Sequence, residues 1–489
     1  MPRPATTPAT PAPAPAHAAP PSPGSPASPA SPASPPTARP TATLAVTAAA
    51  TTVTLMTYSA PMVTLSDTAA ALGTPLSAQA WLLNGAPLGL AALLLVTGSL
   101  ADDYGRRRTF LVGTFALGLT TALAALAHTT LLFTLARVAQ GAASAAVLTS
   151  SLGLLAHAYP AGPGRIRAMG VWGASVSGGI AVASPFSGGL ATLADWRLPY
   201  AVLGLLALAV AVAAPRALSE SRAPRAGRPD LAGALALGLA MVALLAALTL
   251  GRDGWLRAPV GVLLLAAVLL TAVFAYVERR SAAPLLDLGL LRRPPFLAAT
   301  AGGLFTGFSV IGLFSYLPTL LQAANGLSAM HAAWLFAFWS GVSLLVALQA
   351  RRLAGRVPAR HQLAVGFTLH AAALLTMLGA LAADSWVRLL PGLLISGVGS
   401  GLLNAALPLL AVESVPADRA AMGSGANNTA RYLGSAAGVA LMIAVATASG
   451  SSPDDLAHGA DTALVVAAGL AVVAAVSVVL LRERRPARS

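Results

Sequence analysis

Long apolar stretches, separated by short polar segments, run through most of the chain. A helix needs about 20 apolar residues to cross the hydrocarbon core of a bilayer, and fourteen stretches between Thr43 and Leu481 fit that length. They predict membrane-spanning helices at 43–65, 78–100, 109–127, 130–156, 169–190, 197–214, 231–251, 258–277, 297–321, 330–350, 363–383, 386–412, 421–447 and 461–481. The hydropathy pattern therefore predicts an all-α, multi-pass membrane protein.

The distribution of arginine supports this count. All 30 basic residues are arginine, and loops on the cytoplasmic side of a membrane retain basic residues. With the N-terminus inside, 24 arginines fall in inner loops and tails, four in outer loops and two within spans. Because one helix more or fewer would reverse the alternation downstream, we expect fourteen spans with both termini in the cytoplasm.

The composition excludes the soluble classes of protein. A soluble domain carries about 25% charged residues, whereas this chain has 9% charged and 56% hydrophobic residues and a mean hydropathy of +0.75. The net charge of +14 does not indicate a nucleic-acid partner, because such proteins keep their charge on one solvated face. The chain has no cysteine and no phosphate-loop or metal-binding signature. We therefore expect no enzyme activity, no cofactor and no metal.

The predicted spans and the long polar segments divide the chain into five parts. The first holds 15 of the 36 prolines, mixed with Ala, Ser and Thr, which predicts a disordered cytoplasmic tail. A helical hairpin at 231–277, with no charge and few hydroxyls within its spans, is interpreted as an insertion that packs against lipid. The parts are the tail 1–42, a six-helix bundle 43–214, the hairpin with its flanking loops 215–296, a second six-helix bundle 297–481 and a basic cytoplasmic tail 482–489.

The loop after the second predicted span carries a dense polar motif, Gly-Ser-Leu-Ala-Asp-Asp-Tyr-Gly-Arg-Arg-Arg, at 98–108. Asp102 can pair with a helix end or an arginine, and the arginines can contact anionic lipid. Such a charge latch can form in one conformation and break in another. The alternative is an ordinary basic loop. The residues of the predicted latch loop are Gly98, Asp102, Gly105, Arg106, Arg107 and Arg108.

This motif resembles the signature between helices two and three of the major facilitator superfamily. The 6 + 2 + 6 layout resembles its 14-helix drug/proton antiporter family (the EmrB/QacA type), and the resemblance covers nearly all of residues 43–482. It implies the major facilitator fold and proton-coupled efflux of amphipathic drugs or antibiotics by alternating access. A solute importer or facilitator of the same superfamily, or a membrane receptor or scaffold, are the alternatives.

The resemblance also implies partners and a location. The partners are the lipid bilayer, a small-molecule substrate and protons, with the proton gradient as energy source, no nucleic acid and a monomeric chain. The location is a bacterial plasma membrane. The alanine-rich, lysine-free composition is typical of a high-GC genome such as that of an actinobacterium.

An arginine in the fourth predicted span is the first candidate for coupling. The segment Leu-Ala-Arg-Val-Ala-Gln-Gly at 135–141 matches the family's arginine motif, and the resemblance implies a role in proton coupling for Arg137, with Gln140 and Asp102 as further candidates. An arginine inside the bilayer costs ~2.5–3.5 kcal/mol, so it needs polar partners. The alternative is a structural arginine that satisfies the carbonyls of a broken helix.

The fifth predicted span carries small residues at every fourth position from Gly173 to Gly189. Its Pro185, Gly188 and Gly189 resemble the end of the family's antiporter signature, although Ser184 replaces a glycine. Close helix packing explains the stripe equally well.

Polar and aromatic side chains within several spans are candidates for a substrate cavity. Asn427 and Arg431 are four residues apart and share one helix face, although a structural role explains Arg431 as well. The candidates are Thr54, Tyr58, Asn84, Phe308, Trp334, Asn427 and Arg431.

The first predicted span departs from the family pattern, because the stretch 56–63 has no carboxylate where the family carries an acid. Two expectations follow. The substrate is not a multivalent cation, and coupling runs through Arg137 and Asp102 or through protonation of the substrate.

Overall fold

In the computed structural model, the described residues are 39–74, 79–222, 230–251, 254, 256–281, 284–349, 356–383, 385–448, 450 and 452–481. These residues form helices joined by short loops, with no strand among them. Most of the predicted tail 1–42 and all of 482–489 lie outside the described residues. Residues 40–42, which we assigned to the tail, form the first turn of helix α1.

The first bundle contains a broken helix where one continuous span was expected. Pro61 has no N–H and cannot donate to the carbonyl oxygen of Thr57, so the helix is interrupted at Ala60. The helices of this bundle are α1 (Pro40–Ser59), α2 (Pro61–Ala71), α3 (Gln79–Tyr104), α4 (Arg106–Ala125), α5 (Thr130–Ala158), α6 (Pro163–Leu193) and α7 (Arg197–Ala213).

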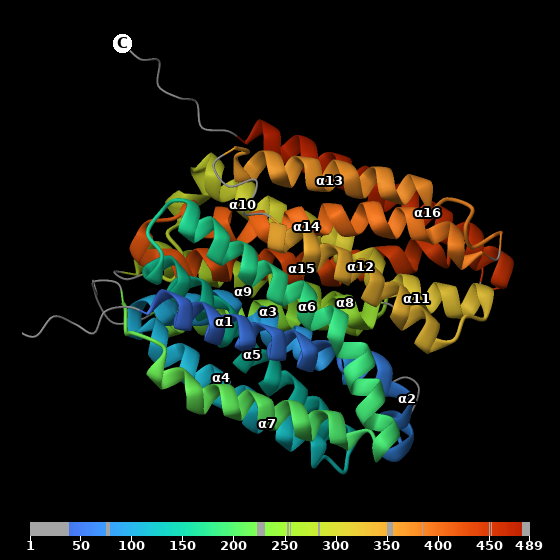
Figure 1. The fold of residues 1–489 in the computed structure, drawn as a ribbon, viewed down its shortest axis with the longest axis horizontal. Coiled ribbons are helices and arrows are strands. Elements are labelled where there is room, and N and C mark those ends of the chain that lie inside the picture. The colour runs from blue at the N-terminus through green and yellow to red at the C-terminus, as the bar shows by residue number, and fades with distance from the viewer. Residues whose placement is uncertain are drawn as a thin grey trace, which may run out of the picture. The chain divides into compact units, whose positions relative to one another are not determined.

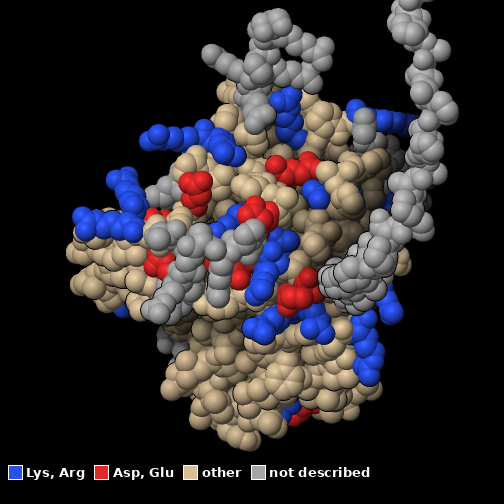
Figure 2. Space-filling view, turned by 90° about the vertical axis from the view of Figure 1, so that its left-hand side faces the viewer, with Lys and Arg blue, Asp and Glu red and all other residues tan. Residues whose placement is uncertain are grey.

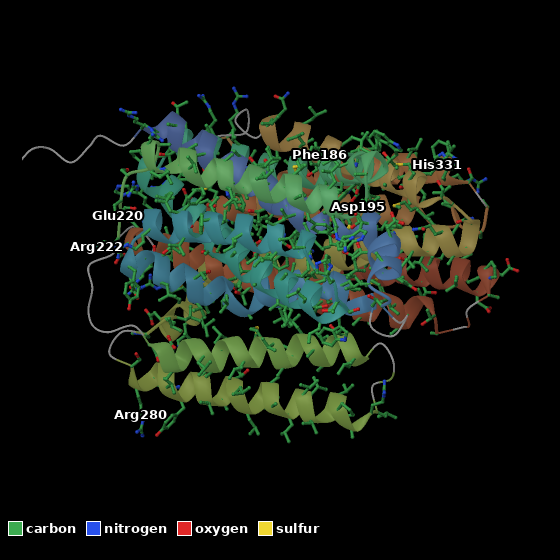
Figure 3. All side chains as sticks on the ribbon, turned by 90° about the horizontal axis from the view of Figure 1, so that it is seen from below. Phe186, Asp195, Glu220, Arg222, Arg280 and His331 are labelled. Atoms are coloured by element: carbon green, nitrogen blue, oxygen red, sulfur yellow. The ribbon has the colours of Figure 1, made fainter. Side chains whose placement is uncertain are left out.

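Two helices, α8 (Leu231–Leu250) and α9 (Ala258–Arg280), form the hairpin. The carboxylate of Asp230 caps α8 by accepting a hydrogen bond from the Gly233 N–H at 2.7 Å. The hairpin lies along one side of the bundles (Figure 3). Helix α8 packs against α3 and α15, whereas α9 packs mainly against α8 and exposes most of its apolar side chains.

The second bundle contains a π-helical segment, η5 (Thr306–Ile311), between two α-helices. It lies where the backbones of η5 and α15 touch: a Cβ added at Gly307 would lie 1.9 Å from the carbonyl oxygen of Arg431. The α-helices are α10 (Pro294–Phe305), α11 (Gly312–Asn325), α12 (Ala329–Gln349), α13 (Ala359–Thr376), α14 (Leu389–Glu413), α15 (Ala420–Ala446) and α16 (Pro453–Leu480).

The bundles meet along two seams, α3 against α15 and α6 against α12 and α14 (Figure 1). At the second seam the helices approach so closely that a Cβ at Gly173 would lie 2.0 Å from the carbonyl oxygen of Asn404. Among the described residues, 12 helical segments are long and apolar enough to cross a membrane. The two predicted spans outside this set correspond to threonine-rich α1 and to α13, which has a polar first turn.

Candidate functional site

Asp102, at the end of α3, joins the two bundles. Its carboxylate accepts hydrogen bonds from the backbone N–H groups of Ala421 at 3.2 Å and Met422 at 2.8 Å, in the first turn of α15. A helix N-terminus has free N–H groups and a partial positive charge, so a carboxylate there is stabilising. Gly98 allows the approach, because a Cβ there would lie 2.5 Å from the Ala421 carbonyl oxygen.

Two ion pairs complete this contact. Arg106 pairs with Asp102 at 2.7 Å and donates to the carbonyl oxygen of Asp418 at 2.8 Å. Arg419, on the second bundle, pairs with Asp103 at 2.8 Å. Arg106 is buried, which corrects the expectation that it contacts lipid. We call these four charged residues and the first turn of α15 the inter-bundle latch.

The other arginines of the motif lie beside an acid that the sequence analysis did not single out. The backbone N–H groups of Arg107 and Arg108 donate to the two carboxylate oxygens of Glu220 at 3.1 and 3.2 Å. Gly105 precedes them with φ of 124°, a conformation that favours glycine. Figure 2 shows acidic and basic side chains gathered on this end of the molecule, which we call the latch end.

Arg137 is fully buried and donates hydrogen bonds to backbone carbonyl groups at the break between α1 and α2. Its guanidinium donates to the carbonyl oxygens of Thr57 at 2.7 Å and Tyr58 at 3.1 Å, and to the side-chain oxygen of Gln140. The Thr57 carbonyl is free because Pro61 cannot donate to it. This is the arrangement of the structural alternative. Arg137 does not line the cavity described next, but it contacts Tyr58, which does.

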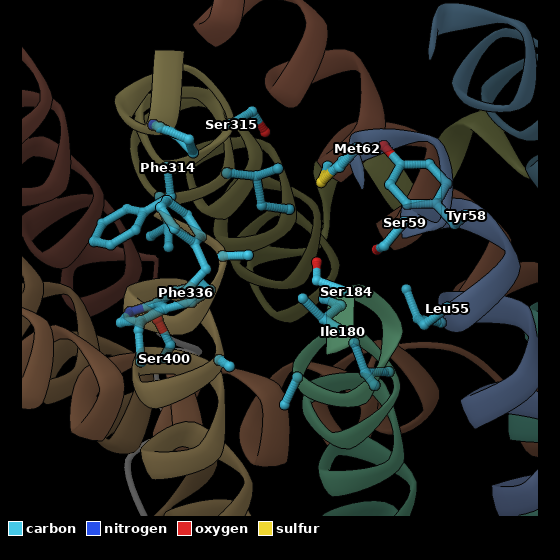
Figure 4. Close-up of a pocket in the computed structure, with 18 of the residues that line it drawn as sticks. Leu55, Tyr58, Ser59, Met62, Ile180, Ser184, Phe314, Ser315, Phe336 and Ser400 are labelled. Carbon is cyan, nitrogen blue, oxygen red and sulfur yellow. The ribbon is translucent and has the colours of Figure 1, made fainter. Parts of the chain in front are cut away.

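A first cavity of about 180 Å³ lies between the bundles (Figure 4), and none of the latch residues lines it. Tyr58 lies on one wall, with Phe314 and Phe336 across from it. Phe314 stacks on Trp339 with ring centroids 4.6 Å apart, and the ring of Phe336 lies edge-on to that of Phe314 at 5.8 Å. This cluster offers flat apolar surfaces to an aromatic ligand.

Arg431, on α15, is the one charged residue among the described residues that line this cavity. Only 6% of its surface is exposed. Its guanidinium forms no hydrogen bond or ion pair with a described residue and lies 5.4 Å from the ring centroid of Tyr432. A charge in such surroundings interacts strongly with an opposite charge, because the local dielectric constant is low.

A group of hydroxyl and amide side chains crosses between the bundles at the Gly173 seam. The Ser177 hydroxyl lies 2.9 Å from that of Ser343, and the amide of Asn404 donates to Ser177 at 3.0 Å. Ser340 donates to the Ser177 carbonyl oxygen at 2.7 Å. Ser177 belongs to the stripe of small residues from Gly173 to Gly189, and its partners lie on α12 and α14 of the other bundle. Periodicity within α6 gave no information about the facing helices.

A second cavity of about 380 Å³ adjoins the first. Leu245, Leu248 and Thr249 of α8 form part of its wall, and the amide nitrogen of Asn84 donates to the Thr249 hydroxyl at 3.4 Å. We expected the hairpin to pack against lipid; α8 also lines this cavity and packs against α3 and α15. None of the described residues that line either cavity is acidic.

The predicted cavity residues separate into two groups. Thr54 donates to the Ala50 carbonyl oxygen and Asn427 to the Ala299 carbonyl oxygen, and neither lines a cavity. Trp334 projects from α12 with 58% of its surface exposed, so its assignment to the cavity is wrong, and Phe308 also lies outside both walls. The predicted residues that do line a cavity are Tyr58, Asn84 and Arg431.

Pro185, Gly188 and Gly189, the residues that resemble the antiporter signature, lie within α6, which continues to Leu193. A Cβ at Gly188 would make only ordinary contacts, and one at Gly189 would meet nothing within 4 Å. Close packing therefore does not account for these two glycines, although it does account for Gly173. Ser184 lines the first cavity.

The helical bundles, the latch and the central cavities define a multi-pass membrane transporter. Residues 47–439 match the family model described as the Major Facilitator Superfamily, and the chain belongs to this family. The solved human organic anion transporter MFSD10 has a similar fold, with a TM-score of 0.63 and 17% identity over 90% of this chain and 99% of that one.

Three curated relatives are resistance or export proteins of actinobacteria. The multidrug resistance protein Stp of Mycobacterium tuberculosis is 32% identical over 75% of this chain and 68% of its own length. The puromycin resistance protein pur8 of Streptomyces alboniger is 33% identical over 85% of this chain and 86% of its own length. The cephamycin export protein CmcT of Amycolatopsis lactamdurans is 32% identical over 90% and 93%.

Proposed function

We propose that this protein exports amphipathic small molecules across a bacterial plasma membrane in exchange for protons, by alternating access between the two bundles. The observation that carries the proposal is the pairing of a closed latch at one end with inter-bundle cavities that none of the latch residues lines. The names of the resistance and export relatives support the direction of transport.

The same proposal fixes an orientation. We place fourteen helices across the membrane, with both termini and the latch end in the cytoplasm, because that end carries the arginines. Glu220, Arg222 and Arg280 lie toward this end, and Asp195 and His331 lie toward the other (Figure 3). In this orientation the closed latch lies on the cytoplasmic side of the cavities, and we assign the structure to the state that releases substrate.

The cavity supports a substrate class. An aromatic body fits the Phe314–Trp339 stack, and an anionic or hydrogen-bond-accepting group fits Arg431, whose charge has no acidic partner among the described lining residues. A multivalent cation would have to approach this charge without a compensating carboxylate, which is unfavourable.

Coupling to protons runs through Asp102 or through an acidic group of the substrate in this proposal. Protonation of Asp102 would remove the negative charge that Arg106 and the first turn of α15 share. The closed latch would weaken as a result, so acidity at this carboxylate favours opening of the latch end. Arg137 contributes by holding the Thr57 and Tyr58 carbonyls beside the cavity.

The experiment is dye uptake into inverted vesicles with an imposed pH gradient, using an anionic xanthene dye and ethidium as a lipophilic cation. We expect gradient-dependent accumulation of the anionic dye. Arg431→Gln should reduce it, whereas Arg280→Gln should not, although Arg280 also lies over a tyrosine ring, at 4.5 Å from the Tyr276 centroid. Uptake that survives collapse of the gradient would rule out proton coupling. A host that becomes more sensitive on overexpression would indicate an importer.

A further inference from the structure

We infer that the second cavity is a separate binding compartment for an uncharged, hydrogen-bonding part of the substrate, such as a sugar or polyol, and that the inserted hairpin forms part of it. This inference rests on the proposed function. It assigns a role to α8 beyond contact with lipid.

The compartment lies where six helices meet. Its walls come from α3, α8, α11 and α15, together with the α1–α2 break. Helix α8 is fixed to the first bundle at this point, because the Thr249 hydroxyl accepts a hydrogen bond from Asn84 at 3.4 Å and donates to the Leu245 carbonyl oxygen at 2.8 Å. Thr249 thereby positions the amide of Asn84 on the wall.

The described lining of the compartment is uncharged, and among its apolar residues it presents a polar face on α11. On α11, Ser315, Thr319 and Gln322 follow the spacing of one helix face, and all three are exposed within the described part of the chain. Gln322 donates to the carbonyl oxygen of Pro318 at 3.2 Å. The hydroxyls of Ser315 and Thr319 form no hydrogen bond with a described residue. Together with Asn84, the face offers donors and acceptors without a fixed charge.

The two cavities differ in chemistry and share a boundary. The first offers stacked aromatic rings and the guanidinium of Arg431, whereas no described lining residue of the second is charged. Tyr58 and Tyr432 line both, with ring centroids 5.9 Å apart, and so do Ser315 and Gln322. Asn84, Thr249 and Thr319 line the second cavity alone. One molecule can therefore place an aromatic part in the first cavity and a hydroxylated part in the second. The volume of about 380 Å³ lies in the range of small-molecule sites.

A matched pair of neutral fluorescent probes tests this division. 4-Methylumbelliferyl β-glucoside carries a sugar on a coumarin, and 7-methoxy-4-methylcoumarin carries the same ring system without the sugar. Loss of one uncharged hydrogen-bonding group from a binding site weakens binding by about threefold to tenfold. In the vesicle assay, Thr249→Val should raise KM for the glucoside by about that factor and leave KM for the methoxycoumarin unchanged.

The control variant is Thr271→Val, on α9. Thr271 donates to the Ala267 carbonyl oxygen at 2.7 Å, as Thr249 does to Leu245, but it lies on the helix of the hairpin that lines neither cavity. It should change neither KM value. If Thr249→Val and Thr271→Val have equal effects, or if both probes respond equally to Thr249→Val, the division of the site is wrong.

A labelling experiment gives an answer that does not depend on transport. The chain has no cysteine, so Leu248→Cys introduces a single thiol on the α8 wall, and Val262→Cys introduces one on the exposed side of α9. A membrane-impermeant methanethiosulfonate should label Leu248→Cys, and the glucoside should slow that reaction more than the methoxycoumarin does. Val262→Cys should stay unlabelled, because we expect this exposed side of α9 to contact lipid, which a membrane-impermeant reagent does not enter.

The outcomes separate the two proposals. If Leu248→Cys is not labelled, or is labelled equally fast with and without the glucoside, the compartment does not bind this group. If protection occurs but wild-type vesicles accumulate neither the glucoside nor the anionic dye in response to the pH gradient, the proposed proton-coupled export fails and the binding compartment stands.

Discussion

Replacing Asp102 with asparagine tests whether the inter-bundle latch holds the structure in its present state. Asparagine keeps the shape and one acceptor oxygen but removes the charge. The carboxylate pairs with Arg106 at 2.7 Å and accepts from Met422 at 2.8 Å. Removing one partner of a buried ion pair costs about 3–5 kcal/mol. Because Arg106 becomes solvated once the latch opens, this cost falls on the closed state.

The expected magnitude follows from that cost. Each 1.4 kcal/mol is about a factor of ten, so Asp102→Asn should shift the closed-to-open ratio on the order of a hundredfold to several thousandfold. The oxygen that asparagine retains places the effect toward the lower end. A closed state that dominates in the wild type would become the minor state or nearly equal to the open state.

The measurement is the distance between two spin labels at the latch end. The cysteine-free chain accepts labels at Arg108→Cys on the first bundle and His361→Cys on the second, both exposed positions. Double electron–electron resonance should show a short distance in the wild type and a longer, broader distribution in Asp102→Asn. Asp195→Asn, which removes an exposed carboxylate paired with Arg197 at 3.5 Å, is the matched control. If Asp102→Asn keeps the wild-type distances, or if Asp195→Asn changes them equally, the reasoning about the latch is wrong.

Three further predictions follow from single contacts. Arg137→Gln leaves the freed Thr57 carbonyl without its donor, which costs about 1–3 kcal/mol for a buried acceptor, and a lower melting temperature in nanodiscs checks it. Gly173→Val puts side-chain atoms where a Cβ already lies 2.0 Å from the Asn404 carbonyl oxygen, so the seam at α6 must separate and transport in the vesicle assay should fall at least tenfold. Trp334→Ala should leave KM for the anionic dye unchanged, since Trp334 projects away from both cavities; a raised KM would contradict that placement.

The sequence predicted the position of the helices better than the direction of their faces. Hydropathy and loop charge were enough to predict where the helices lie, because both are local properties of the sequence. It could not show that Pro61 divides the first span into α1 and α2, or that Arg137 would then find the Thr57 carbonyl. Trp334 was misplaced because α12 is apolar on nearly every side, and such a helix gives no periodic signal for the face that meets the cavity.

The candidate site shows the same division. Asp102, Tyr58 and Arg431 were predictable because each is polar within or beside an apolar helix, where a polar residue needs a partner or a function. The α8 wall was not, because its cavity-lining residues include ordinary leucines. Only the tertiary contacts of α8 with α3 and α15 distinguish it from α9.

The π-helical segment η5 has a consequence for the face that α11 presents. The Gly312 N–H bonds to the Gly307 carbonyl oxygen, five residues back, so the segment holds about one residue more than an α-helix would over the same rise. One residue corresponds to about 100° of rotation in an α-helix, which has 3.6 residues per turn. A regular α-helix over the same sequence would turn Ser315 and Gln322 away from the second cavity, whereas deletion of one residue between 306 and 311 would preserve their direction. The π-helical segment thus rotates α11 about its own axis relative to α10. This rotation determines which side chains of α11 face the substrate.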